Sequence, residues 1–253
     1  MKKSIKYFID NDLNSYSGDI RILELLKYNK KNQFKCIYCY EEADSREHIP
    51  SKIFLNEPYE SNLAILPSCI KCNNAFSENE QYLACLIDYV QYKLSKLKTV
   101  KRKKIEKTFK TRPHIKNEFE KSTKYTNDGN LEYIEFSHER IKTILLKLSI
   151  GHAIYSLSSI CLGEPSFINY KFYIQLTKDE MANFNLEPIS NIIPEFGSRE
   201  GIYISMLDEG IPITTWNIVQ NGQYRFLAYE DKGSTNIRIV IGEYFYIEVI
   251  WTK

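Results

Sequence analysis

The chain has 253 residues, 43% of them hydrophobic and 26% charged, which is the composition of a globular protein with a sizeable core. Its net charge of +2 excludes a polybasic coat for nucleic acid. No stretch reaches the roughly 18 apolar residues of a membrane-spanning helix, and the N-terminus lacks the apolar segment of a secretory signal. We therefore expect a cytoplasmic protein without membrane contact.

In the first half of the chain, apolar residues at helical spacing predict a short helix over residues 20–28. Ser77 with Glu80 three residues later forms a capping box, which predicts that a long helix begins there. In residues 93–112, ten of twenty residues are Lys or Arg and one is acidic. We expect a long basic helix in this region.

The second half changes character after a polar segment, residues 113–130, whose Asn-Asp-Gly-Asn sequence is a turn signal. A strand over 131–136 and a helix over 138–159 follow, and Asn221-Gly222 predicts a hairpin turn. Further strands are predicted over 170–177, 201–206, 214–220, 224–229 and 237–251. The predicted fold class is α+β, with a nuclease-like module at 1–112, a linker at 113–130 and a C-terminal domain at 131–253 built on a mainly antiparallel sheet.

Four cysteines form two CxxC pairs, Cys36 with Cys39 and Cys69 with Cys72, separated by 29 residues. In a reducing compartment such pairs are typical of a metal site rather than of disulfides. Four thiolates complete a tetrahedral zinc site and leave no open position for water, so we predict a structural Zn2+. Cys85 and Cys161 stand among apolar residues and are predicted to be buried.

The segment between the two pairs carries a recognisable order of residues. Glu47-His48-Ile49-Pro50 is followed by Asn62-Leu63, and the second pair ends in Cys72-Asn73-Asn74. Over about 45 residues this pattern is similar to the HNH endonucleases, the zinc-bearing branch of the ββα-metal (His-Me finger) nucleases. The resemblance implies an endonuclease that hydrolyses phosphodiester bonds and leaves a 5′-phosphate and a 3′-hydroxyl.

The resemblance also assigns roles. It implies His48 as the general base, for which an imidazole is suited because it is largely neutral at cellular pH. Glu47, standing where Asp is commoner, and Asn73 are implied as ligands of a catalytic Mg2+ or Mn2+ ion distinct from the zinc. Asn62 is implied to orient the base. The alternative for His48 is a histidine that only supports the fold near the zinc.

Four basic residues are candidates for nucleic-acid contact. Arg46 lies next to His48, and a guanidinium can bind a phosphate through two hydrogen bonds. Arg102, Lys103 and Lys104 belong to the basic segment, where contacts to phosphates give affinity without sequence information. The alternative for this segment is a solvated helix face.

Beyond the finger motif, the whole chain resembles a group of bacterial HNH proteins, which share blocks similar to KLSIGHAIY, WNIVQNGQYRF and IRIVIGEYFYIEVIW. Some stand-alone HNH proteins of this kind act in defence against phage, so an antiviral effector is one role that the resemblance implies. DNA is the preferred substrate class, and RNA is left open. A regulatory or targeting protein partner and self-association are left open. The alternative function is a zinc-stabilised module that binds nucleic acid or protein through a degenerate active site.

Overall fold

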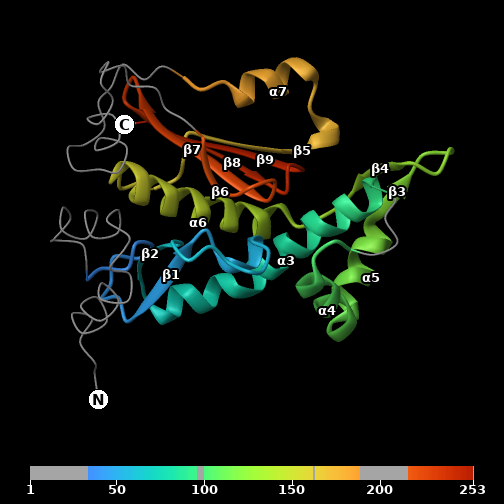
Figure 1. Ribbon diagram of the computed structural model, residues 1–253, viewed down its shortest axis with the longest axis horizontal. Helices are drawn as coiled ribbons and strands as arrows, with labels where there is room; N and C mark the ends of the chain where they lie inside the picture. The colour runs from blue at the N-terminus through green and yellow to red at the C-terminus, as the bar shows by residue number, and fades with distance from the viewer. Residues whose placement is uncertain (1–33, 96–99, 162, 189–215, 253) are drawn as a thin grey trace. The chain divides into compact units, whose positions relative to one another are not determined.

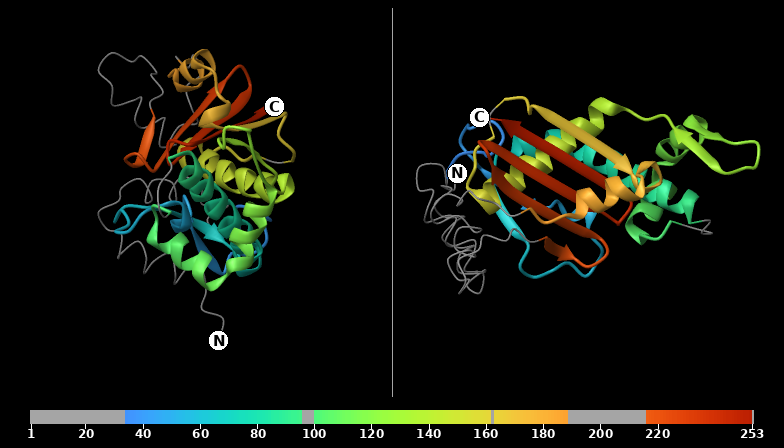
Figure 2. Two further views of the ribbon diagram at one scale, coloured as in Figure 1. Left: turned by 90° about the vertical axis from the view of Figure 1, so that its right-hand side faces the viewer. Right: turned by 90° about the horizontal axis from the view of Figure 1, so that it is seen from above.

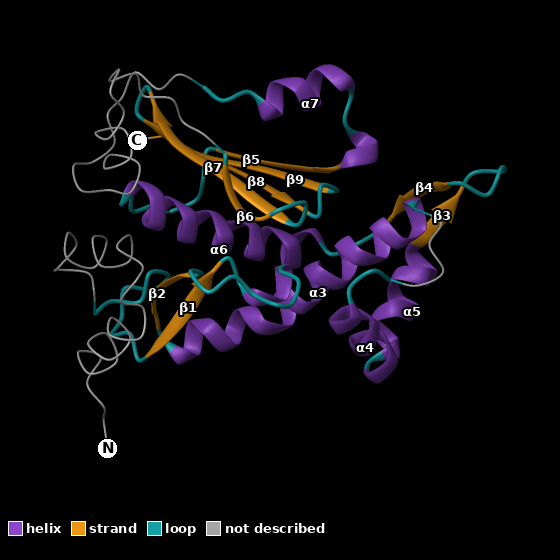
Figure 3. Cartoon of the chain, in the orientation of Figure 1, coloured by secondary structure: helices purple, strands orange, loops and turns teal. Residues whose placement is uncertain are grey.

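A computed structural model describes residues 34–95, 100–161, 163–188 and 216–252, and the structural statements below concern these ranges. The chain contains both helices and antiparallel strands, as Figures 1 and 3 show, so the predicted α+β class is confirmed. Among these residues no helix is both long and apolar enough to cross a membrane. The helix predicted over 20–28 and the strand predicted over 201–206 lie outside the described residues.

The chain divides into two compact units, one made of residues 1–75 and 145–253, the other of residues 76–144. The first unit contains a two-stranded sheet, β1 (Ser45–Ile49) with β2 (Ala64–Ser68), and a five-stranded sheet. The predicted domain boundaries at residues 112 and 130 both fall inside the second unit.

The five-stranded sheet has the order β5-β9-β8-β7-β6, and every neighbouring pair is antiparallel, as predicted (Figure 2). Its strands are β5 (Phe167–Phe172), β6 (Asn217–Gln220), β7 (Tyr224–Asp231), β8 (Ser234–Ile241) and β9 (Phe245–Thr252). The predicted hairpin turn at Asn221-Gly222 is confirmed, since it joins β6 to β7.

Two strand predictions differ from the structure. The strand predicted over 170–177 ends at Phe172, and Tyr173–Gln175 form a short 3-10 helix. The apolar residues 237–251 do not form one strand but the hairpin of β8 and β9. Gly242 and Glu243 both have positive φ, 65° and 57°, which is the backbone geometry of a tight hairpin turn that matches the twist of its strands. Both faces of the sheet are covered, so most side chains on both faces of these strands are apolar. The apolar pattern alone therefore does not indicate the turn between β8 and β9.

Helix α6 (His138–Leu157) passes along one face of the sheet, and α7 (Lys178–Asn185) lies over the other (Figure 1). On the α6 side, His152 Nε2 lies 2.8 Å from the Tyr224 hydroxyl and the His152 ring stacks on Phe226. On the other side, Arg238 Nη1 donates to the carbonyl oxygen of Phe184 at 3.0 Å. The predicted helix over 138–159 is confirmed, and its apolar stripe belongs to the core.

The second unit is built on the later turns of α3 (Ile70–Leu94), with α4 (Lys103–Thr111), α5 (Pro113–Ser122) and the hairpin of β3 (Thr123–Tyr125) and β4 (Leu131–Ile134). Residues 113–122 were expected in a linker but form α5. Pro113 occupies the first helical turn, where its missing N–H removes no helical hydrogen bond. The ring of Phe119 packs against that of Tyr82, with 5.2 Å between the ring centroids. Residues 93–112 do not form one long basic helix, because α3 ends at Leu94 and α4 begins at Lys103.

Helix α3 begins seven residues earlier than the capping box at Ser77 and Glu80 predicted, so that box lies inside the helix. The cap comes from a distant residue instead. The backbone N–H of Ile70 donates to the Asp44 carboxylate at 2.7 Å, which satisfies one of the unpaired donors of the first turn. This early start places the second cysteine pair at the N-terminal end of α3.

Candidate metal centre and nuclease site

The four predicted zinc ligands come together. The Sγ atoms of Cys36, Cys39, Cys69 and Cys72 all lie within 4.8 Å of one another, and those of Cys39 and Cys69 are 3.7 Å apart. Zinc–sulfur bonds of about 2.3 Å in a tetrahedron place the sulfurs about 3.8 Å from each other. The cluster therefore has the dimensions and the ligand chemistry of a structural zinc site.

Local backbone geometry shapes each cysteine pair. In the first, Tyr40 N–H donates to Cys36 O at 2.9 Å, and Tyr40 itself adopts a positive φ of 61° to close the turn. In the second, Cys69 precedes α3 and the N–H of Cys72 points at Cys69 Sγ, 3.3 Å away. A hydrogen bond from Ile37 N to Pro67 O, 3.1 Å long, joins the two pairs.

The thiols of the chain differ in their electrostatics. Burial, together with the adjacent sulfurs of Cys69 and Cys39, raises the pKa of the Cys72 thiol far above its usual range. Four such sulfurs can be anionic together only around a cation, which favours zinc at this position. Cys85, as predicted, is buried, and burial raises the pKa of its thiol to about 12. Cys161 is half-buried rather than buried as predicted.

Strands β1 and β2 form a hairpin whose two faces differ. Glu47 and Ile49 of β1 point to the buried face, opposite Leu66 and Ala64 of β2. Because side chains alternate along a strand, Arg46 and His48 of β1 point to the opposite face. The order of β1, β2 and α3, with cysteines at both ends of the hairpin, is a ββα succession around the metal centre.

The His48 imidazole is half-buried, and its Nδ1 atom is buried without a hydrogen-bond partner. Burial lowers the pKa of His48 to about 4, and the positive charges of Lys52 and Arg46 act in the same direction. The ring is therefore neutral around physiological pH, with two cationic side chains near it. Lys52 lies in the short helical turn η1 (Lys52–Phe54) that follows β1.

The Glu47 side chain lies on the other face of β1 from His48. The residue is 5% exposed on the buried face of β1, where its Oε1 forms an ion pair of 2.8 Å with Nζ of Lys147 from α6. The same oxygen accepts a hydrogen bond of 3.1 Å from the Ser51 hydroxyl. The predicted role of Glu47 and Asn73 as ligands of a catalytic ion stays a prediction. In the structure the Glu47 carboxylate is paired with Lys147, on the face of β1 opposite to that of His48.

The two predicted asparagines are placed differently. Asn73, in the first turn of α3, donates from Nδ2 to the backbone oxygen of Arg46 at 3.1 Å, so its amide is tied to β1 one residue before Glu47. Its Oδ1 remains as a hard oxygen donor. Asn62 is exposed in the turn before β2, and no hydrogen bond joins it to His48 in the described structure. Its expected role in orienting the base stays a prediction.

Of the predicted nucleic-acid contacts, Arg46, Lys103 and Lys104 are exposed. Arg102 is buried, however, and its Nε atom donates to both oxygens of the Asp88 carboxylate at 2.9 Å. A guanidinium held in this way inside the second unit is not offered to a phosphate. The basic segment therefore combines a structural arginine with a solvated lysine face at the start of α4.

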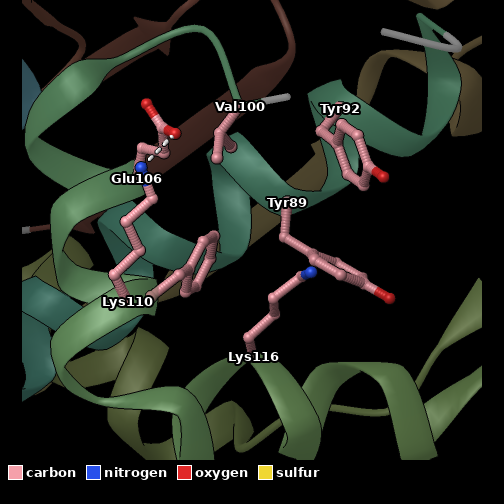
Figure 4. A pocket seen from close by; sticks show the side chains of 7 residues that line it. Tyr89, Tyr92, Val100, Glu106, Lys110 and Lys116 are labelled. Atoms are coloured by element: carbon pink, nitrogen blue, oxygen red, sulfur yellow. Dashed lines mark ion pairs between the residues drawn. The ribbon is translucent and has the colours of Figure 1, made fainter. Parts of the chain in front are cut away.

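The second unit also has an open hollow of about 220 Å³ (Figure 4). The residues that line it include Tyr89, Tyr92, Lys110 and Lys116. Lys110 forms an ion pair of 2.7 Å with Glu106 across one turn of α4. The hollow is mostly apolar and, by its lining alone, does not identify a ligand.

Sequence reasoning missed three residues around the hairpin, namely Ser51, Lys52 and Lys147. For Lys147 a signal existed, because it stands within the apolar stripe of a helix between Leu145 and Leu148. A lysine in such a stripe is buried only with an acidic partner. The identity of that partner, 100 residues away, is not visible in the sequence.

The chain was compared with protein-family models, with curated proteins and with solved structures, and none of the three comparisons found a match.

Proposed function

We propose that the chain is an endonuclease of the HNH type that hydrolyses phosphodiester bonds of DNA, with His48 as the general base. The proposal combines the resemblance of residues 36–80 to HNH nucleases with the ββα succession around a four-cysteine centre. The zinc serves to hold the hairpin and the start of α3 together, because a site of four cysteines has no open position for catalysis.

The observation that carries the proposal is the environment of His48. The His48 imidazole is half-buried on the face of β1 opposite Glu47 and is neutral, and a neutral imidazole can take a proton from an attacking water molecule. The cationic side chains of Arg46 and Lys52 near the same ring provide what an approaching phosphate requires, namely attraction and stabilisation of the charge that builds up on its oxygens.

Within this mechanism, Arg46 binds the scissile phosphate and His48 holds the proton released by water. Asn73 fixes the position of β1 relative to α3 through its hydrogen bond to Arg46 O. The resemblance implies a Mg2+ or Mn2+ ion, which when bound supplies Lewis-acid stabilisation of the phosphoryl group. Asn73 Oδ1 is suited to such an ion, whereas Glu47 is not, so no step is assigned to Glu47.

The proposed substrate is DNA rather than RNA, approached through phosphate contacts that include the exposed Lys103 and Lys104. Such contacts carry no sequence information, and a targeting or regulatory partner is proposed to supply it. The wider resemblance to stand-alone HNH proteins favours a role as an effector against phage.

A second candidate function is a zinc-stabilised binding module whose active site has degenerated. The observation that favours it is the engagement of Glu47 by Lys147, since the resemblance gives that position to a metal ligand. In this alternative the hairpin presents Arg46 and His48 for binding only.

Plasmid nicking decides between the two. The wild-type chain and His48→Ala are compared with Mg2+ or Mn2+ present, and zinc is quantified in both proteins. We expect the substitution to lower the nicking rate at least about a hundredfold, which is the usual contribution of a general base, while the zinc content stays the same. If neither protein cuts any DNA or RNA substrate, the binding module is the better description.

A further inference from the structure

The buried face of β1 is held to α6 by a compact polar cluster that neither the motif nor the proposed chemistry explains. Lys147 Nζ lies 2.8 Å from Glu47 Oε1 and 2.6 Å from Ser51 Oγ, and Ser51 in turn donates to Glu47 Oε1. The Lys147 side chain is 0% exposed and the Glu47 side chain 6%. A lysine and a glutamate with so little access to water are stable as ions only while they face each other.

The packing around this cluster is equally close. One helical turn after Lys147, Gly151 faces Ile49, two residues after Glu47 on the same side of β1. A Cβ atom on Gly151 would lie 2.6 Å from Ile49 Cδ1, so only glycine allows this approach without a shift. Lys147 of α6 therefore contacts Glu47 of β1, and Gly151 of α6 contacts Ile49 of β1. The first contact is polar and the second is apolar, and together they hold β1 against α6.

A serine next to a lysine can also form a nucleophilic pair, but the geometry here does not favour it. Ser51 and Lys147 are 5% and 1% exposed, which leaves no approach for a substrate. A lysine that activates a serine has to be neutral, whereas Lys147 faces a carboxylate that stabilises its charged form. The cluster has the properties of an internal support.

We infer that Lys147 is a positioning residue of the proposed nuclease site and that Glu47 is its counter-ion rather than a ligand of the catalytic ion. The inference builds on the proposed function. Glu47 and His48 are adjacent on β1 with opposite directions, so the ion pair that holds Glu47 in the interior determines how far His48 projects on the other face. In this chain the carboxylate that the resemblance assigns to a divalent cation is paired with the ammonium group of Lys147.

The test uses the full chain and a pair of apolar substitutions. Lys147→Met and Glu47→Leu each remove one member of the buried ion pair and keep the other charge, whereas the double variant Glu47→Leu/Lys147→Met replaces the ion pair by apolar side chains of similar length. Lys178→Met, which changes an exposed lysine of α7, is the matched control. Melting temperature, zinc content, binding of Mn2+ and steady-state nicking are measured for every variant.

We expect Lys147→Met to lower both the melting temperature and kcat, the latter at least about tenfold with KM unchanged at a temperature where the variant is folded. The double variant is expected to recover the melting temperature, to bind Mn2+ within about threefold of wild type, and to regain most of kcat. A ligand role for Glu47 predicts the opposite, because no variant without the carboxylate would then recover Mn2+ binding or nicking. That outcome, in a double variant that folds and holds zinc, overturns the inference.

Failure of the proposed function is recognised separately. If the wild-type chain neither binds Mn2+ nor nicks DNA, the nuclease proposal fails, and with it the assignment of Lys147 to the positioning of a catalytic base. The melting temperatures then report only on the ion pair as a structural element.

Discussion

The Asp44 carboxylate accepts a hydrogen bond of 2.7 Å from the backbone N–H of Ile70, although the two residues are 26 positions apart. Asp44 directly precedes the strand that carries His48, and Ile70 is the first residue of the helix that carries Cys72 and Asn73. One exposed carboxylate thus caps α3 and holds the helix to the beginning of β1. Its negative charge also lies at the positive end of the helix dipole.

Removing this cap provides the first prediction. Asp44→Ala leaves the N–H of Ile70 without its partner, so we expect a loss of about 1 kcal/mol in the free energy of unfolding, the usual effect of losing a helix cap. Zinc affinity is expected to fall as well, because Cys69 and Cys72 flank the capped turn. Denaturant unfolding and competition with a coloured zinc chelator measure the two effects. Asp44→Asn, which retains an acceptor oxygen, serves as the control and should lie close to wild type.

Zinc itself provides the second prediction. We expect the purified chain to hold one zinc ion, and Cys39→Ser to lose most of it, since the variant leaves three thiolates of a four-thiolate site. The melting temperature should fall in step with the zinc content. Cys161→Ser, which lies outside the cluster, should bind zinc like the wild type. Elemental analysis of the three proteins is the measurement, and equal zinc in all of them would contradict the four-cysteine site.

The third prediction concerns alkaline pH. Burial raises the pKa of Cys85 to about 12 from the usual 9, so the folded chain keeps a proton that the unfolded chain loses. The corresponding stability is complete below pH 9 and is lost as the pH rises from 9 towards 12. The loss is about 1 kcal/mol for each pH unit in this window.

The measurement compares the free energy of unfolding of wild type and Cys85→Ala at pH 8 and pH 10. Buried tyrosines with raised pKa values destabilise both proteins at high pH, but they cancel in the difference between them. We expect the advantage of the wild type over the variant to be smaller at pH 10 by about 1 kcal/mol. An unchanged difference would show that the Cys85 thiol titrates normally. A native chain whose Cys85 reacts with iodoacetamide at pH 8 would indicate the same.

The fourth prediction separates the basic residues of α4 and its N-terminal flank. Arg102→Met leaves the Asp88 carboxylate buried without its cation, which typically costs about 3–5 kcal/mol. The double variant Asp88→Asn/Arg102→Met should recover part of that loss. Lys103→Ala/Lys104→Ala should leave stability almost unchanged and instead weaken DNA binding, with a shallower dependence of affinity on salt. Thermal unfolding and binding titrations at two salt concentrations distinguish these effects, and a lysine variant with wild-type affinity would remove α4 from the DNA-binding surface.

The parts of the fold that sequence reasoning predicted correctly depend on short-range rules. Two CxxC pairs place their sulfurs by local turns, so the cluster could be predicted even though 29 residues separate the pairs. The turn at Asn221-Gly222 and helix α6 likewise depend on residues close in sequence. These features follow from turn chemistry and helical periodicity, which a single sequence displays.

The parts that it predicted incorrectly depend on partners distant in the chain. The start of α3 is set by Asp44 and not by the local capping box at Ser77. In the sequence Arg102 does not differ from the other basic residues of its segment. Only the structure shows that it forms an ion pair with Asp88 of α3. The direction of Glu47 follows from its position on the buried face of a two-stranded hairpin, which residue order alone does not reveal.

The separation between Glu47 and Lys147 also has a consequence for the order in which the protein is made. Synthesis proceeds from the N-terminus, so the cysteine pairs and the His48 strand leave the ribosome while Lys147, 100 residues later, has not been added. Until then the Glu47 carboxylate has no cation to receive it, and the buried face of β1 has no helix to cover it. The nascent chain thus carries every residue of the motif before it has the ion pair that joins β1 to α6, and the proposed nuclease site would be complete only when synthesis has passed the middle of the protein.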